Sequence, residues 1–302
     1  MTEQRLRLYG PRMKVLAEPD GSLFTLLLDE FDNETQESKI VTLQVPRGQL
    51  GRQPTKHDLR TVRAAPLLDA AAGVLPAAPL ARNWSRYYQP DGNLGSFIPL
   101  GTFNNMTFGD CTCAAFGHLD AAVCAASGAP TSVTTQLVLE AYDAISPWDR
   151  SNPTANDNGA WNLDALKWFQ KQGLITAYAK VYSRAHVELC INLFHGVYVG
   201  AELPESAKHQ QTWDVAPAGS TDPSYKPRSW GGHAMFAIGY DQGGVWFATW
   251  GHRQYATWAW FLTYVDEAYV ALHRNLVADG SKLSPAGYLA GQISSALSIC
   301  KG

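Results

Sequence analysis

The chain has 302 residues, of which 46% are hydrophobic and 17% charged, and its formal net charge is −3 at pH 7. This composition predicts a sizeable core and excludes wholesale disorder. The small net charge gives no overall attraction to nucleic acid or to an anionic membrane. The sequence contains no run of about 18 apolar residues, so we expect no membrane span. The N-terminus lacks the apolar stretch of a secretory signal.

The five cysteines are odd in number, and their spacing fits no paired zinc pattern. We therefore expect free thiols in a reducing compartment, with neither a metal nor a cofactor. The sequence also lacks the zinc-protease word HExxH, the phosphate-binding loop and the dinucleotide-binding glycine word. Metal-dependent hydrolysis and nucleotide chemistry are thus disfavoured.

In residues 1–46, three apolar runs separated by turn residues predict a small β meander: Met13–Leu16, Leu23–Leu28 and Ile40–Val45. Residues 47–82 are first basic and then Ala-rich, which indicates a linker or an extended arm lying on the main domain. Their basic part, 47–63, has five basic residues against one Asp. We interpret it as solvated; a contact strip for an acidic partner is the alternative.

The main domain is predicted to span residues 83–302. Its expected elements are helices at Cys111–Ser127, Thr134–Ile145, Leu163–Gly173 and Val187–Phe194, strands at Gly196–Leu203, His233–Tyr240 and Val245–Trp250, and helices at Phe261–Arg274 and Ala286–Ile299. Helices cluster first and strands follow, so the predicted class is α+β, with a helical half before an antiparallel β half.

Two residues carry the expected chemistry. Cys111 opens a predicted helix, and His233 opens a predicted buried strand. A thiol becomes acidic when helix-end N–H groups and an imidazolium surround it, which is the arrangement of a cysteine hydrolase. A histidine at the head of an apolar strand is costly without a partner. A hydrogen-bonded core histidine remains the alternative.

Helix geometry favours Cys111 over Cys113 as the nucleophile. At about 100° per residue, Phe116 and Leu119 define the buried face of the helix, and Cys111 points away from it. Cys113 lies closer to that face, so we expect it to be a small buried hydrophobe. His118 shares the outer face with Cys111 and is expected at the surface, too far along the helix to serve as its base.

Five short words follow one another in the order found in papain-like cysteine peptidases. They are Asn83-Trp84, Asn105-x(5)-Cys111, Asn158-Gly159-Ala160, His233-Ala234-Met235 and Thr249-Trp250-Gly251. Over residues 83–274 the chain therefore resembles that fold family. The words Gly-Asp-Cys-Thr, Gly-Gly-His and Thr-Trp-Gly, preceded by Leu50–Thr61, are further similar to uncharacterised papain-like proteins of tailed phages and prophages.

The resemblance implies roles for individual residues. Cys111 would be the nucleophile and His233 the general base and acid. Asn105 would donate its side-chain NH₂ to an oxyanion, together with the backbone N–H of Cys111. The family's His-orienting Asn falls on Ala248, so the neighbouring Thr249 is the expected substitute.

Substrate contacts are implied for Gly159, whose backbone would meet an extended peptide, and for Asn158 and Trp250 beside it. The function implied is a thiol hydrolase that cleaves peptide or isopeptide bonds. The alternative is a catalytically weak or inactive papain-like module that serves as a structural or binding protein of a phage virion. The absent Asn and the N-terminal meander, which would pack on the main domain or on a partner chain in a homo-oligomer or virion, favour this alternative. The expected location is the host cytoplasm or the virion.

Overall fold

The computed structural model describes residues 13–17, 23–31, 38–46, 48–70, 77–84, 102–127 and 129–277. The chain divides into two compact units, 1–47 and 48–302. The first unit holds an antiparallel sheet of order β1-β2-β3, formed by Met13–Ala17, Leu23–Phe31 and Ser38–Pro46. The predicted meander is therefore confirmed.

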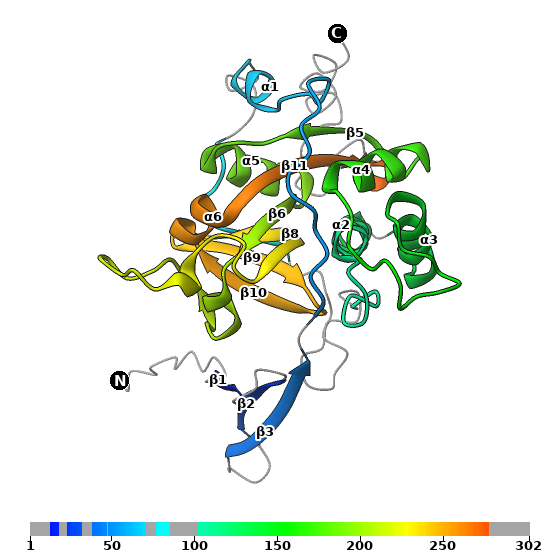
Figure 1. Ribbon diagram of the computed structural model, residues 1–302. Coiled ribbons are helices and arrows are strands. Elements are labelled where there is room, and N and C mark those ends of the chain that lie inside the picture. The colour runs from blue at the N-terminus through cyan, green and yellow to red at the C-terminus, as the bar shows by residue number, and fades with distance from the viewer. Residues whose placement is uncertain are drawn as a thin grey trace. The chain divides into compact units, whose positions relative to one another are not determined.

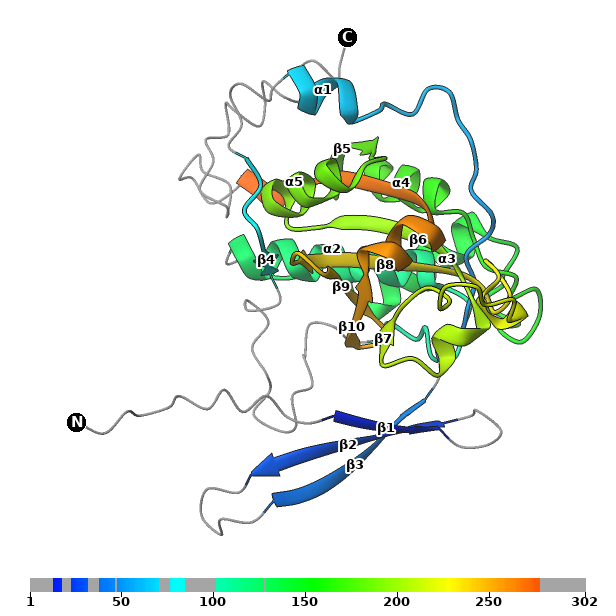
Figure 2. The same ribbon diagram turned by 90° about the vertical axis from the view of Figure 1, so that its left-hand side faces the viewer.

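The second unit joins a group of helices to an eight-stranded sheet, in the α+β arrangement that the sequence predicts (Figures 1 and 2). Its helices are α1 (Ala65–Ala70), α2 (Cys111–Ser127), α3 (Thr135–Ile145), α4 (Asn162–Lys171), α5 (Arg184–Phe194) and α6 (Trp258–Tyr264). Its strands are β4 (Arg82–Asn83), β5 (Ile175–Lys180), β6 (Val197–Leu203), β7 (Thr212–Trp213), β8 (Gly231–Tyr240), β9 (Gly244–Thr249), β10 (His252–Thr257) and β11 (Val265–His273). Three short 3₁₀ turns, η3 (Glu205–Lys208), η4 (Pro223–Tyr225) and η5 (Arg274–Val277), complete the described elements.

The sheet has the order β5-β11-β6-β8-β9-β10-β7, with β4 paired to β8. Every pair is antiparallel except β10 with β7. Helices α2, α3 and α4 pack on one another, and α2 packs on β8 (Figure 1). The start of α2 thus lies against a central strand of the sheet.

The helix α2 is buried on all sides rather than on one. The carbonyl of Asp110 accepts the first helical N–H groups, from Cys113 at 2.8 Å and Ala114 at 3.0 Å. Every residue from 111 to 124 is buried, including His118 at 2% exposure. The expectation of a solvent-facing side that carries Cys111 and His118 is therefore wrong, because α2 lies inside the domain between the sheet and other helices.

The predicted helix Phe261–Arg274 is wrong over most of its length. Helix α6 begins after the cap Thr257, whose hydroxyl accepts the N–H of Trp260 at 3.1 Å, and it ends at Tyr264. The following residues form β11, which pairs with both β5 and β6. Its apolar residues are buried on both faces, and such a run cannot be told from a buried helix by periodicity. The predicted helix Ala286–Ile299 lies outside the described residues.

The strand β8 places His233 deep in the molecule. Residues 232–240 are all buried, as expected of a strand covered on both faces. His233 pairs with Ala201 of β6, while Thr249 ends the neighbouring strand β9. The side chains of His233 and Thr249 therefore lie next to each other. No helix in the described part of the chain is long and apolar enough to cross a membrane.

The residues before α1 form an extended arm on the second unit. In Figure 1 this blue segment crosses the front of the domain where the helices meet the sheet, and Figure 2 shows it along the outer edge. Lys56 pairs with Asp164 at 2.8 Å, and Lys167 pairs with Asp58 at 2.8 Å. The arm therefore lies on the domain while Lys56 stays 43% exposed, and the interpretation of 47–63 as solvated is wrong at Arg52, whose side chain is fully buried.

The core of the helical half should depend strongly on one ring pair. Phe116 of α2 stacks on Phe169 of α4 with ring centroids 3.8 Å apart, and both side chains are fully buried. We expect Phe116→Ala to lower the free energy of unfolding by about 3–5 kcal/mol, measured by urea denaturation. Leu262→Ala, at a side chain that is 61% exposed, should change it by less than about 0.5 kcal/mol. Equal losses would contradict this assignment of the core.

Candidate active site

The thiol of Cys111 meets strand β8 next to His233. Its Sγ accepts the backbone N–H of Ala234 at 3.4 Å. Cys111 is 1% exposed and His233 is fully buried. The structure thus brings the start of α2 and the start of β8 together. No hydrogen bond joins Sγ to the His233 ring among the described residues.

The ring of His233 is held from two sides. Its Nε2 lies 2.6 Å from Oγ1 of Thr249, so one of the two donates to the other. The indole of Trp250 stacks on the imidazole with centroids 4.2 Å apart and an interplanar angle of 22°. Nδ1 has no hydrogen-bond partner among the described residues. The ring is therefore oriented through Nε2, which leaves Nδ1 free to exchange a proton.

Burial keeps both groups neutral in this state. Loss of solvent raises the pKa of the Cys111 thiol to about 12, although hydrogen bonds from the backbone of Ala234 and Gly51 oppose the rise. Burial also lowers the pKa of His233 well below its ordinary value, and the nearby His118 and Arg52 add to the effect. Burial in this state therefore favours a thiol and a neutral imidazole over a thiolate–imidazolium pair.

The side-chain amide of Asn105 is bound to two backbone carbonyls. Its Nδ2 donates to the carbonyl of Gln49 at 3.3 Å and to that of Phe108 at 3.0 Å. The carbonyl of Asn105 in turn accepts the N–H of Gln49 at 2.7 Å. Asn105 thus presents an NH₂ group to an extended backbone beside α2, and in this structure that backbone belongs to the chain's own arm.

The arm segment Gly48–Gln53 also covers the three residues that the sequence assigns to substrate contacts. The carbonyl of Asn158 accepts the side-chain amide of Gln53. Gly159 has φ +79°, and a Cβ there would lie 1.5 Å from the carbonyl oxygen of Gly51. A Cβ on Gly48 would strike the ring of Trp250 at 1.7 Å.

Backbone hydrogen bonds hold the same segment to both halves of the domain. From the helical half, Ala160 donates to Gly51 at 2.8 Å and accepts from Gln53 at 2.9 Å. From the sheet, the carbonyl of Gly232 accepts the N–H of Arg52 at 3.0 Å. Gly48–Gln53 therefore fills the space above Cys111 as an added strand would, which explains why the thiol has no access to solvent.

Sequence analysis missed the partners of Arg52. Its guanidinium, with a side chain of 0% exposure, donates to Glu267 at 2.8 Å and to Asp266 at 2.7 Å. The phenol of Tyr269 donates to the other oxygen of Glu267 at 2.9 Å. Because 261–274 was predicted to be helical, its two acids had no assigned place in the site. No motif in the sequence identified this pair.

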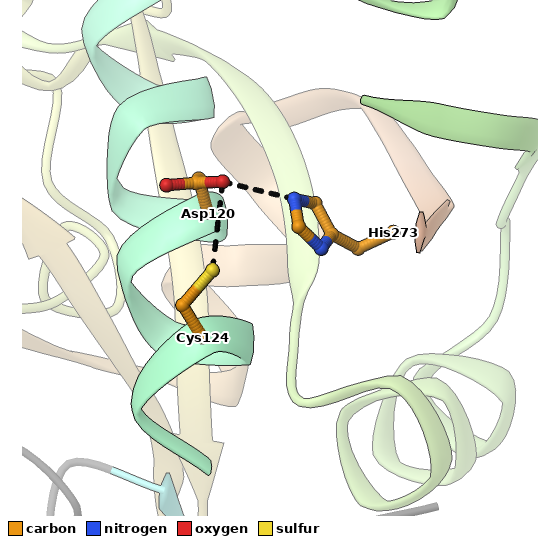
Figure 3. Close-up of side chains that lie close together, drawn as sticks. All are labelled: Asp120, Cys124 and His273. Atoms are coloured by element: carbon orange, nitrogen blue, oxygen red, sulfur yellow. Dashed lines mark hydrogen bonds and ion pairs between the residues drawn. The ribbon is translucent and has the colours of Figure 1, made fainter. Parts of the chain in front are cut away.

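A second buried polar cluster lies away from this site (Figure 3). Asp120 of α2 stands between Cys124, one helical turn on, and His273 at the end of β11. The ligand atoms of the three lie within 4.8 Å of one another, which is close enough for a metal ion. The expectation of no metal ligands did not foresee this cluster.

Hydrogen bonds give these three side chains a structural role. His273 donates from Nε2 to Asp120 at 2.9 Å and accepts the N–H of Asn275 at Nδ1, 3.2 Å away. The other oxygen of Asp120 accepts the N–H groups of Ser132 at 2.8 Å and Val133 at 3.0 Å. The cluster ties α2 to β11 and to the loop before α3. A metal would have to displace these bonds.

Comparisons with known proteins add little to this geometry. No family model matches the chain. No curated protein matches it either. Among solved structures, the chain is similar to a cysteine protease of Carica candamarcensis in complex with E-64, at 14% identity and a TM-score of 0.40, covering 65% of this chain and 99% of that one.

Acid should weaken the Asp120 cluster. Burial alone would raise the pKa of Asp120, but His273 and two backbone N–H groups outweigh it, so the pKa lies below its ordinary value of 3.8. The stabilisation is therefore present above about pH 4 and is lost as the pH falls further. Asp120→Asn should lower the free energy of unfolding by on the order of 1–3 kcal/mol at pH 7. It should also reduce the loss of stability below about pH 4, which we call the acid limb.

Urea denaturation between pH 7 and pH 2.5 measures this limb. Asp143→Asn, on the exposed side of α3, is the matched control and should keep the wild-type acid limb. If Asp120→Asn also keeps it, the carboxylate does not contribute in the way that its contacts imply.

Proposed function

We propose that the protein is a thiol hydrolase that cleaves peptide or isopeptide bonds through Cys111 and His233. The observation that carries the proposal is the meeting of the Cys111 thiol at the start of α2 with the backbone next to His233, whose Nε2 is bound by Thr249. A thiol, a neighbouring imidazole and a group that orients the imidazole are the three parts that nucleophilic thiol catalysis requires.

In the proposed reaction Nδ1 of His233 takes the proton from Sγ, and the thiolate forms a bond to the carbonyl carbon of the substrate. The oxyanion accepts hydrogen bonds from the Asn105 amide and from the backbone N–H of Cys111. As the C–N bond breaks, His233 returns the proton to the leaving amine. Water, deprotonated by the same imidazole, then attacks the thioester and releases the acid and the free thiol.

The state described here is a covered one. The Asn105 amide is engaged with Gln49, and burial keeps Cys111 and His233 neutral. When the segment Gly48–Gln53 leaves, water reaches both groups and the desolvation that disfavours their ions is relieved. The helix start and the imidazolium then favour the thiolate. Activity is therefore expected only from molecules in which this segment has moved.

A second candidate is a binding or virion-structural module with a vestigial dyad. The covered and neutral thiol favours it, as does Thr249 in place of an amide. Its phage association rests on the sequence words alone. The two candidates differ in one respect that can be measured, because only the hydrolase requires His233 to activate Cys111.

Thiol reactivity separates the candidates. We expect iodoacetamide at pH 6 to modify Cys111 of the native chain ahead of Cys113 and Cys190, since opening the arm uncovers only the first. His233→Ala should slow this modification at least about tenfold, because the thiolate loses its partner. Peptide mapping by mass spectrometry measures each site, and circular dichroism checks the fold. An unchanged rate at Cys111 in His233→Ala would refute the dyad.

Thr249 should act by orienting His233. Thr249→Val removes the hydroxyl at nearly constant volume, and we expect it to slow modification of Cys111 several-fold, while Thr249→Ser restores the rate. Thr263→Val, on the exposed side of α6, is the control and should react as wild type does. If valine at 249 reacts like wild type, the hydroxyl has no positioning role.

A further inference from the structure

The most unusual occupant of the covered site is a fully buried arginine. Arg52 belongs to the extended arm and to no helix or longer strand, yet its side chain has 0% exposure. Burial of a charge is costly unless the charge is paired, and a hydrophobic side chain would usually serve packing as well. A guanidinium that is bound by two carboxylates is therefore better explained by recognition than by packing.

The pocket is shaped for this one side chain. Asp266 and Glu267 each accept one of the two terminal nitrogens of Arg52, and Tyr269 fixes Glu267 from behind. Gly200 forms part of the wall, where a Cβ would lie 2.7 Å from Cδ of Arg52. Two acids that meet the two ends of a planar fork are the usual recognition of arginine rather than lysine.

The backbone beside the pocket fits an extended polypeptide with glycine before the arginine. A Cβ on Gly51 would lie 1.7 Å from the carbonyl oxygen of Gly109, so no other residue fits there without movement. On the sheet side, a Cβ on Gly232 would lie 2.2 Å from the carbonyl oxygen of Arg52. Glycines on both sides thus let the two halves of the domain approach the backbone of the occupant.

We propose that Asp266 and Glu267 form a binding subsite for the arginine of an extended Gly-Arg polypeptide, with Gly48–Gln53 as its tethered occupant. This rests on the proposed function only in placing a reactive thiol beside the subsite. The backbone of Gly51 reaches the thiol of Cys111, and Arg52 is the next residue. The substrate class is therefore a protein or peptide that is cleaved within a residue or two of such an arginine.

The arm and the substrate compete in this arrangement. Arg52, held in the same chain, fills the subsite at a high effective concentration. A second polypeptide gains the site only when the arm leaves. Weakening the Arg52 pair should therefore open the site to a peptide of the same sequence added in solution.

Direct binding tests the subsite without requiring any hydrolysis. The probe is a fluorescent peptide Leu-Gly-Arg-Gln-Pro-Thr, the sequence of residues 50–55, and its neutral analogue carries citrulline for arginine. In full-length Arg52→Met, measured by anisotropy, the arginine peptide should bind at least about tenfold more tightly than the citrulline peptide. Adding Glu267→Gln should remove this preference. Replacing Gly by Ala in the peptide should weaken binding at least about tenfold.

The controls keep the outcomes distinct. Arg60→Met, at a side chain that is 87% exposed, should bind the peptide as weakly as wild type, because Arg52 still fills the pocket. Equal affinity for arginine and citrulline peptides, or no binding to a folded Arg52→Met chain, overturns the proposal. If Arg52→Met does not fold, hydrogen exchange of the wild-type chain tests the subsite instead. Excess arginine peptide, but not citrulline peptide, should speed exchange at the amides of Arg52 and Gln53. Equal exchange with the two peptides overturns the proposal.

The same binding measurement in the double variant of Arg52→Met with Cys111→Ala, whose arm no longer fills the pocket, separates this proposal from the hydrolase. Arginine-dependent binding without cleavage of the peptide by Arg52→Met would leave the subsite standing and remove the hydrolase. Cleavage of peptides irrespective of arginine would keep the hydrolase and remove the subsite.

Discussion

The ion pair between Arg52 and the two acids at the start of β11 is the interaction on which the state of the site depends. It fastens an extended arm across the junction of the helical half and the sheet. Without the arm, the groups around Cys111 would face solvent. The buried thiol, the neutral imidazole and the occupied Asn105 amide all follow from one segment being in place.

The electrostatics of the pair explain how such a contact can be both firm and reversible. Burial raises the pKa of Glu267, while the guanidinium of Arg52 and the phenol of Tyr269 oppose the rise. Removal of the cation would leave a carboxyl group that can take a proton rather than remain as an isolated buried charge. The domain can therefore lose the arm without being left with an unpaired anion in its interior, because the side chain of Asp266 is 27% exposed.

The sequence was informative where local pattern and burial agree. Helix α2 and the β1–β3 meander were predicted because their periodicity and turn residues are clear. The placement of Cys111 near His233 followed from the order of short words, since a helix start and a strand start can meet only through the fold. Within the candidate site, helix α2 and strand β8 are the elements that local sequence patterns identify.

Prediction from sequence failed where tertiary burial determines the exposure of a side chain or the type of secondary structure. Helix arithmetic placed His118 outside because it assumes one solvated face, and α2 has none. The run that forms β11 fits a helix equally well from its sequence, because an apolar stretch buried on both faces has no diagnostic period. The sequence around Arg52 predicts a solvated side chain, as for most arginines. Its partners Asp266 and Glu267 lie more than 200 residues away in the sequence and make its burial possible. The sequence around Arg52 does not indicate them.

Hydrogen exchange at the backbone amides of Arg52 and Gln53 tests the central claim most directly. Both amides donate to backbone carbonyls of the domain in the covered state, to Gly232 and to Ala160. In full-length wild type at neutral pH, we predict slow exchange at both positions, and Glu267→Gln should accelerate it while leaving the amides of β8 protected. Exchange at the rate of an unstructured peptide in wild type, or equal protection in Glu267→Gln, would contradict the account.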